Sequence, residues 1–153
     1  MDKQYILNNS IKIGQGTMRT VYELNNRIFK IGNIGNSKEW NNYNKLTNQE
    51  KQLVTKILNF NNDILEVEKV IPLDKYLIQK GVNKYLIRSV ADRGTLFTLL
   101  QRFESYFKNI ILPDKKLLHN IMDKLSLTYD EFLYSLNWGI TNDNKLVCLD
   151  FER

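Results

Sequence analysis

Apolar and polar residues alternate along the first third of the chain, which predicts β structure. The alternation runs from Tyr5 to Ile13, and the β-branched and aromatic segment Thr20–Leu24 continues it. Asn25–Asn26 then predicts a two-residue turn, because asparagine tolerates positive φ angles, and Arg27–Ile31 predicts the returning strand. Together these segments predict a three-stranded antiparallel meander.

Two further strands and one helix are expected before the middle of the chain. Ser37 has the character of a helix N-cap, and apolar residues at helical spacing follow it in Lys38–Leu46. Residues 52–60 indicate the end of a helix followed by a strand, and residues 64–71 a strand that Pro72 ends. The first half is therefore predicted to hold five antiparallel strands with one helix inserted after the third.

The second half changes to helical spacing from Asp74 onward. Two amphipathic helices are indicated by the apolar sets Leu96, Leu99, Leu100, Phe103, Phe107 and Leu117, Leu118, Ile121, Met122, Leu125. A β-hairpin over residues 138–141 and 145–149 closes the chain. We expect an α+β fold of two lobes, residues 1–71 and 72–153, within one compact domain.

The length of 153 residues suits one domain, and the hydrophobic share of 42% excludes a disordered chain. No apolar run approaches a membrane span, and no apolar segment follows the N-terminus, so we expect neither membrane contact nor secretion but a cytoplasmic protein. The single cysteine, Cys148, and the single histidine, His119, exclude an internal disulfide and a cysteine or histidine metal cluster.

The net charge of +5 and the pI near 9.2 are compatible with nucleic acid or an acidic partner. The lysines are spread, however, with Lys115–Lys116 as their densest pair, which favours a generally basic surface. A single alanine, Ala91, among many Asn, Lys and Ile residues indicates coding bias of an AT-rich genome: a low-GC bacterium, its plasmids or a phage.

Three separate features of the first half carry candidate chemistry. Gly14 and Gly16 lie between strands, where glycines let backbone N–H groups approach a polyphosphate, although a tight hairpin also explains them. Lys30 projects from a predicted strand and either reaches phosphate oxygens or faces solvent. Glu39 lies early in the predicted helix, where a carboxylate also suits the helix dipole.

The final hairpin supplies a fourth feature. Asn137 precedes its first strand and Asp150 follows its second, so both side chains belong to the same end of the hairpin. Their oxygens are suitable ligands for Mg²⁺, with a turn cap and a solvated carboxylate as the plainer interpretation.

The order of these features resembles the protein-kinase-like fold. Gly14, Gly16 and Val21 match three of the four fixed positions of the Gly-rich loop G-x-G-x-x-G-x-V. The resemblance implies that Lys30 and Glu39 are the strand lysine and its helix partner. It further implies an adenine pocket with Val67 behind it and Glu68–Lys69–Val70 as its hinge, ATP with Mg²⁺ as the ligand, and Asn137 with Asp150 at the metal. The segment from Asn137 to Glu152 also resembles small kinase-like proteins of phages.

The departures from the kinase pattern are as informative. Arg19 replaces the third loop glycine and is expected to lie over the phosphates or to block them, and Ile28 replaces a small alanine and narrows the adenine pocket. Phe132 stands where the catalytic aspartate belongs, with Asp130 or Glu131 as the candidate replacement base. The chain ends at Arg153, so we expect the activation segment and the peptide-substrate platform to be missing.

These observations favour a pseudokinase-like protein that binds and modulates a protein partner, plausibly a phage-encoded factor directed at a host protein in the host cytoplasm, in host takeover or against host defence. The expected activity leans away from an enzyme, with bound ATP and Mg²⁺ left open. One alternative is an active small ATP- and Mg²⁺-dependent phosphotransferase. A basic nucleic-acid-binding module is the least favoured alternative.

Overall fold

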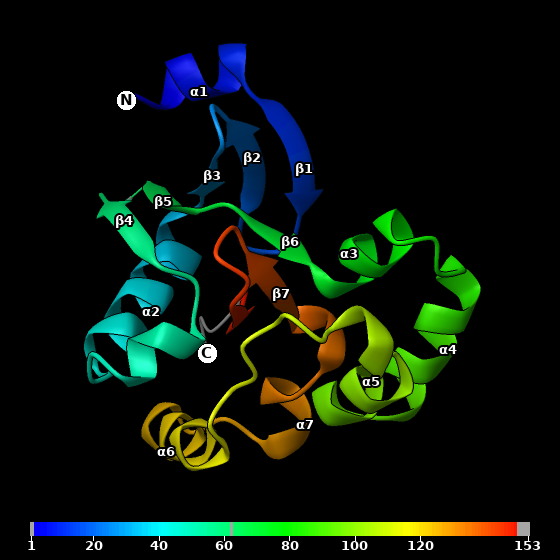
Figure 1. The fold of residues 1–153 in the computed structure, drawn as a ribbon. Coiled ribbons are helices and arrows are strands. Elements are labelled where there is room, and N and C mark those ends of the chain that lie inside the picture. The colour runs from blue at the N-terminus through cyan, green and yellow to red at the C-terminus, as the bar shows by residue number, and fades with distance from the viewer. Residues whose placement is uncertain (1, 62, 150–153) are drawn as a thin grey trace.

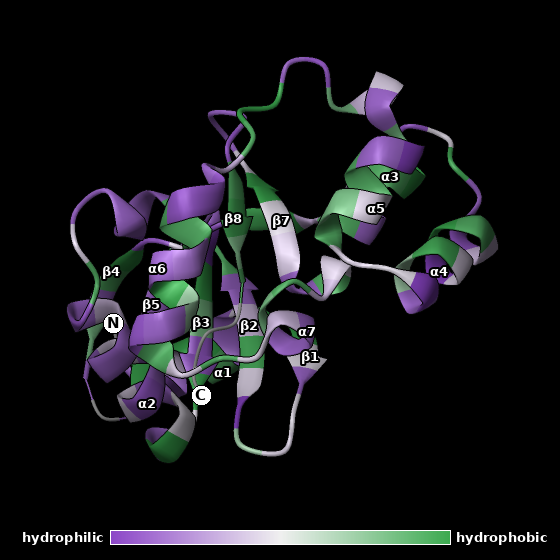
Figure 2. Ribbon diagram, turned by 90° about the horizontal axis from the view of Figure 1, so that it is seen from below, coloured by the Kyte–Doolittle hydropathy of each residue, from purple (hydrophilic) through white to green (hydrophobic). Residues whose placement is uncertain are grey.

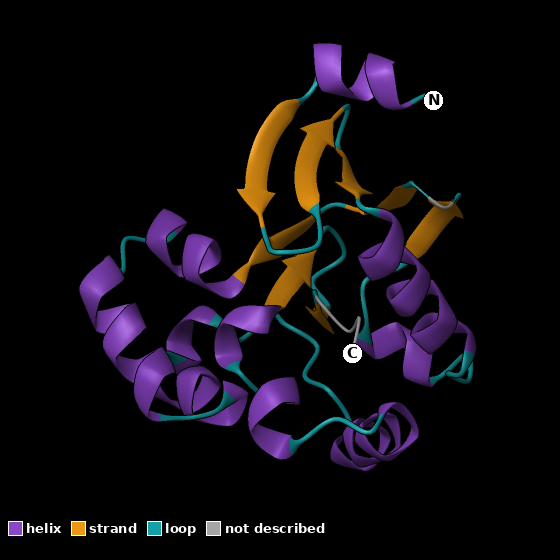
Figure 3. Ribbon diagram, turned by 180° about the vertical axis from the view of Figure 1, so that it is seen from behind, coloured by secondary structure: helices purple, strands orange, loops and turns teal. Residues whose placement is uncertain are grey.

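The computed structural model describes residues 2–61 and 63–149. Within them, the fold is α+β, with one five-stranded antiparallel sheet, one three-stranded sheet and seven α-helices. Figures 1 and 3 show the strands of the larger sheet gathered at one end of the molecule and most of the helices at the other, with the smaller sheet between them. The predicted α+β class and the predicted five-stranded antiparallel sheet are confirmed.

The five-stranded sheet has the order β1-β2-β3-β5-β4, and every neighbouring pair is antiparallel. Its strands are β1 (Ile11–Gln15), β2 (Thr20–Leu24), β3 (Arg27–Ile31), β4 (Ile57–Phe60) and β5 (Ile64–Glu68). Asn25 and Asn26 form the predicted turn with φ angles of 52° and 62°. The short turn explains why β2 and β3 pair in register from Thr20 opposite Ile31 to Leu24 opposite Arg27.

The predicted strand over Tyr5–Ile13 is wrong in its first half, which forms helix α1 (Lys3–Asn9). The Asp2 side chain caps this helix by accepting a hydrogen bond of 2.8 Å from the Tyr5 backbone N–H. Ile6 alone is buried in α1, where it packs in a small cluster with Phe29 and Ile64. The alternation of apolar and polar residues over so short a segment is typical of a strand. In the structure, the segment is instead a helix that Asp2 caps and in which Ile6 is the single buried residue.

Helix α2 (Asn33–Asn44) begins earlier than predicted, so the assignment of Ser37 as its N-cap is wrong. The residue at the N-cap position is Gly32, with a φ of 151°. The buried positions in α2 include Asn36, Glu39 and Asn42, which are polar. The spacing of apolar residues therefore predicted only the second half of α2. The short 3₁₀ helix η1 (Glu50–Leu53) and then β4 follow it.

The predicted strand over residues 64–71 is divided between the two sheets. β5 ends at Glu68, and β6 (Val70–Pro72) joins the smaller sheet of order β6-β7-β8, with β7 (Trp138–Thr141) and β8 (Leu146–Cys148). β7 and β8 confirm the predicted closing hairpin. β8 is green in Figure 2, in agreement with its three buried apolar residues.

The predicted helical character of the second half is confirmed. Helix α6 (Lys115–Leu125) covers its predicted apolar set, whereas α5 (Leu96–Arg102) covers only Leu96, Leu99 and Leu100 and ends before Phe103 and Phe107. The others are α3 (Leu73–Gln79), α4 (Lys84–Arg93), α7 (Tyr129–Phe132) and the 3₁₀ helices η2 (Glu104–Tyr106) and η3 (Ser135–Asn137). The longest of the described helices, α2, has 12 residues, and none of them combines the length and apolarity needed to span a bilayer.

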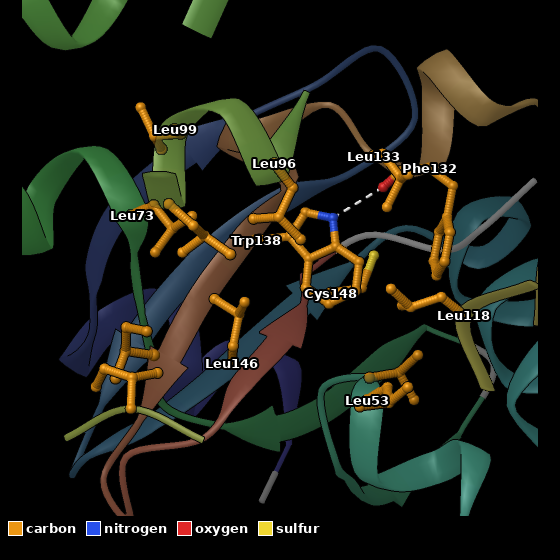
Figure 4. Close-up of a cluster of buried hydrophobic side chains, with 14 of the residues drawn as sticks. Leu53, Leu73, Leu96, Leu99, Leu118, Phe132, Leu133, Trp138, Leu146 and Cys148 are labelled. Atoms are coloured by element: carbon orange, nitrogen blue, oxygen red, sulfur yellow. Dashed lines mark hydrogen bonds between the residues drawn. The ribbon is translucent and has the colours of Figure 1, made fainter. Parts of the chain in front are cut away.

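The largest buried cluster lies around Trp138 and joins the smaller sheet to the helices (Figure 4). Trp138 is fully buried, and its indole N–H donates a hydrogen bond of 2.8 Å to the Phe132 carbonyl oxygen. Leu53 and Val54, from the first half of the chain, belong to the same cluster. The Cys148 carbonyl oxygen accepts hydrogen bonds from the N–H (2.9 Å) and the hydroxyl (2.8 Å) of Thr55, which attaches β8 to that segment.

Candidate functional site

A cavity of about 540 Å³ lies where the five-stranded sheet meets β6 and α3. This volume is typical of a site for a small molecule. Its lining comes from both halves of the chain: Ile13, Gly16, Thr17, Met18, Arg19, Val21, Glu23, Ile28, Lys30, Thr55, Val67, Glu68, Lys69, Val70, Ile71, Pro72, Lys75, Gln79 and Leu149. The structure thus brings together six of the predicted cofactor-binding residues at this cavity: Gly16, Arg19, Val21, Lys30, Glu68 and Val70.

The apolar wall of the cavity comes from neighbouring strands of the larger sheet. Val21 lies opposite Lys30 in the β2–β3 ladder, and Ile28 lies opposite Val67 in the β3–β5 ladder. Ile28 and Val67 are buried at 8% and 2% exposure. The cross-strand register therefore places Ile28 beside Val67.

The polar end of the cavity contains a buried ion pair between Lys30 and Glu39. The Lys30 ammonium is 3.0 Å from Oε1 and 3.2 Å from Oε2 of Glu39, and it donates a third hydrogen bond of 3.0 Å to the Leu149 carbonyl oxygen. A lysine ammonium has three N–H donors, so these three acceptors match all of them. Glu39 is fully buried and Lys30 is 7% exposed, so the pair is shielded from water.

Arg19 completes this polar end in a way that the sequence did not indicate. Its guanidinium donates 2.9 Å to Glu39 Oε1 and 3.2 Å to Asn36 Oδ1, and the residue is only 8% exposed. The expectation that Arg19 lies over phosphates or blocks them did not foresee these contacts with α2. The available signal was the pair of glycines at the start of α2, Gly32 and Gly35, which leave space for a long side chain.

The two loop glycines have different positions. Gly16 lines the cavity, and its N–H donates 2.8 Å to the Arg19 carbonyl oxygen, which closes the turn between β1 and β2. Gly14 lies in β1 opposite Val21, next to a bulge, and does not line the cavity. Glu39 also lies behind the cavity lining and reaches the site through Lys30.

Asn137, the predicted metal ligand, ends η3 and is half-buried. Its carbonyl oxygen accepts a hydrogen bond of 2.7 Å from the Leu149 N–H, so Asn137 lies beside the end of the final hairpin, as expected. Its predicted companion, Asp150, lies outside the described residues.

The candidates for a catalytic base belong to α7. Phe132 is 2% exposed, and its ring packs edge-on against Trp138 with the centroids 5.4 Å apart. Asp130 and Glu131 lie in the first turn of α7, are exposed, and do not line the cavity.

A smaller polar cavity of about 360 Å³ is lined by residues from the end of α2, from η1 and from the β7–β8 hairpin, and it shares Glu68 with the larger one. Burial raises the pKa of the Tyr43 hydroxyl at its wall. A hydrogen bond from the Thr141 hydroxyl lowers the pKa of Asp143, which also lines this cavity.

The chain matches no protein-family model, and no curated protein matches it either. Its function is therefore inferred from the geometry of the larger cavity.

Proposed function

We propose that this protein has a kinase-like bilobal fold, binds a purine nucleotide in the larger cavity, and acts by binding a protein partner and not by phosphoryl transfer. The observation that carries the proposal is the apolar cavity of about 540 Å³ with the buried Lys30–Glu39 pair at its polar end. The two lobes would be residues 1–71 and 72–153, with the cavity between them.

The backbone of β6 supports recognition of a base. β6 pairs with β7 through Val70 opposite Thr141, Ile71 opposite Ile140 and Pro72 opposite Gly139. Proline has no N–H, and the Thr141 N–H already donates to Lys145, so the β6–β7 hydrogen bonds pass through Ile71 and Ile140. By the alternation of an antiparallel ladder, the N–H and C=O of Val70 then face away from β7.

Val70 also borders the cavity, and within the described chain β6 is the edge strand of its sheet. A donor and an acceptor on one residue, next to the apolar surfaces of Val21, Ile28 and Val67, suit the hydrogen-bonding edge and the flat faces of a purine. Adenine is the base that the kinase resemblance implies, and ATP with Mg²⁺ is the ligand to test first.

Two features favour binding over catalysis. All three donors of the Lys30 ammonium already have acceptors, so a phosphate would have to displace one of them. Phe132, at the position of the expected base, is a buried ring that accepts no proton. The protein partner, a host protein if the chain is phage-encoded, is inferred from the sequence resemblance.

The test is a thermal-shift titration with ATP, ADP and adenosine, each with and without Mg²⁺. A ligand concentration of about 100 times Kd stabilises the native protein by about 2.7 kcal/mol. For a chain of this size, that stabilisation raises the melting temperature by several degrees. The variant Ile28→Phe fills the cavity and is expected to abolish the shift. Leu24→Phe, on a β2 residue that packs in the Ile6 cluster, is the matched control and should keep it.

Absence of any shift with all three ligands would overturn nucleotide binding. A phosphate-transfer assay with Mg²⁺-ATP tests the second half of the proposal. Turnover that disappears on Asp150→Ala would show an active phosphotransferase instead, and capture of a partner from cell extract without turnover supports the binding function.

A further inference from the structure

We propose that Arg19 is a positioning residue. It acts as a latch, that is, its contacts fasten the turn between β1 and β2 (residues 16–19) to helix α2. The part of the cavity lining that this turn supplies is thereby held in place before a ligand binds. The latch itself rests on contacts within the chain. Only its effect on ligand affinity rests on the proposed nucleotide-binding function.

The contacts of Arg19 link three parts of the fold. Its guanidinium reaches Glu39 (2.9 Å) and Asn36 (3.2 Å) on α2. Asn36 is fully buried and donates in turn to the Lys30 carbonyl oxygen on β3 and to the Asp63 carbonyl oxygen before β5, each at 2.9 Å. Arg19 therefore binds to a residue that is itself fixed against the sheet.

Two glycines make room for the Arg19 side chain. A Cβ atom added at Gly35 would lie 2.7 Å from Arg19 Cδ, and one at Gly32 would lie 2.7 Å from Arg19 Cγ. Gly35 is inside α2, where alanine is normally the more stable residue. Because Glu39 and Asn36 hold the guanidinium at the end of the Arg19 side chain, moving this side chain away from a Cβ at position 35 would break these contacts. Glycine at position 35 thus leaves the space that the Arg19 side chain occupies.

The latch acts on the cavity through the turn that carries it. Gly16, Thr17 and Met18 line the cavity, and the Gly16 N–H bonds to the Arg19 carbonyl oxygen at 2.8 Å. Fixing Arg19 on α2 therefore fixes this turn relative to Lys30 and Glu39. A turn that is ordered before the ligand binds loses less conformational freedom on binding, which raises the affinity for the ligand.

A double-mutant cycle tests the latch without any ligand. In the wild type, Gly35→Ala forces Arg19 out of place, and we expect the melting temperature to fall by several degrees. In an Arg19→Ala background the space is empty, and the same Gly35→Ala change should raise the melting temperature by roughly 2 °C, because alanine favours the helical conformation over glycine. This reversal of sign is the signature of the latch.

Gly32→Ala is the matched control. Gly32 has a φ of 151°, and a Cβ there would also overlap the Met18 carbonyl oxygen, so alanine is strained whether or not Arg19 is present. Gly32→Ala should therefore destabilise the protein in both backgrounds, somewhat less with Arg19→Ala because the overlap with Arg19 Cγ is removed, whereas the effect of Gly35→Ala should change sign. Equal changes on Gly35→Ala in both backgrounds would overturn the latch.

The affinity for ADP, measured by calorimetry, tests the positioning role. Arg19→Ala should weaken binding about tenfold, and Arg19→Lys, which keeps the charge but loses the planar fork, should recover part of it. Unchanged affinity in Arg19→Ala would overturn positioning even if the cycle shows coupling. If the wild type binds no ADP, the proposed function and the positioning role both fail, while the cycle still decides whether the latch exists.

Discussion

At the scale of single residues, the carboxylate of Glu39 is the feature on which the site depends. It is fully buried and is neutralised by Lys30 on β3 and by Arg19 in the turn between β1 and β2. Removing one partner of a buried ion pair leaves a buried charge without its counter-charge, which typically lowers the free energy of unfolding by about 3–5 kcal/mol.

We therefore expect Lys30→Ala to lower the free energy of unfolding by about 3 kcal/mol, toward the smaller value because Arg19 remains bound to Glu39. Lys115→Ala is the control. Lys115 is exposed at the start of α6, over the Phe97 ring, and its loss should cost less than about 1 kcal/mol. Urea denaturation of both variants checks the difference, and equal losses would contradict the buried-pair assignment.

Glu50 gives a second prediction, on pH. Burial disfavours its charge, but hydrogen bonds from Lys124 (2.6 Å) and the Thr47 N–H (2.8 Å) outweigh burial and lower its pKa. A carboxyl whose pKa is lower in the folded state contributes stability above its ordinary pKa of about 4.3, and that contribution is lost as pH falls through the folded value.

Glu50→Gln should therefore flatten the fall in unfolding free energy below about pH 4. Thermal melts between pH 3 and pH 7 would measure this. Glu104→Gln, at an exposed position of η2, is the matched control and should keep the wild-type slope. If the unfolding free energy of Glu50→Gln falls with pH as steeply as that of the wild type, groups other than Glu50 cause the loss of stability in acid.

At the scale of elements, the turn between β2 and β3 depends on positive φ at Asn25 and Asn26. Asn26→Ala should destabilise the protein by about 1 kcal/mol, because a Cβ-bearing residue other than Asn or Asp is strained there. Asn26→Gly should cost nothing, because glycine adopts this conformation freely. Melting temperatures of the two variants check the turn, and equal destabilisation by both would contradict this explanation.

The elements that sequence reasoning recovered are those whose apolar residues recur at the spacing of a strand or helix and pack in one of the hydrophobic clusters. The β2–β3 hairpin, α5, α6 and the closing β7–β8 hairpin fall in this class. The Lys30–Glu39 contact was also anticipated, from the order of motifs. Helix α1 was missed because one buried isoleucine gives no periodicity, and the start of α2 because its buried positions are polar. The role of Arg19 was missed because Gly32 and Gly35 are visible in the sequence, but their packing against Arg19 is a contact between separate segments that apolar periodicity does not predict.

At the scale of the whole molecule, one core supports both halves of the chain. Leu53 and Val54 pack in the cluster that contains Trp138 and Leu146. Trp138→Phe removes the hydrogen bond to the Phe132 carbonyl and leaves a buried acceptor unsatisfied, which should cost about 2–3 kcal/mol. Trp40→Phe is the control. Trp40 is half-buried and stacks on Phe60 at 5.0 Å, so its loss should be smaller, and the opposite ranking in urea would contradict the assigned core.

Because β8 is attached to the segment at Thr55, the buried thiol of Cys148 can be used to measure how often this junction between β8 and Thr55 opens. Cys148 is the only cysteine of the sequence and is 1% exposed, and the next residue, Leu149, receives the Lys30 hydrogen bond at the cavity. A water-soluble disulfide reagent can reach the sulfur only when the junction opens. The labelling rate under native conditions therefore reports the free energy of that opening. A ligand that closes the cavity should slow it.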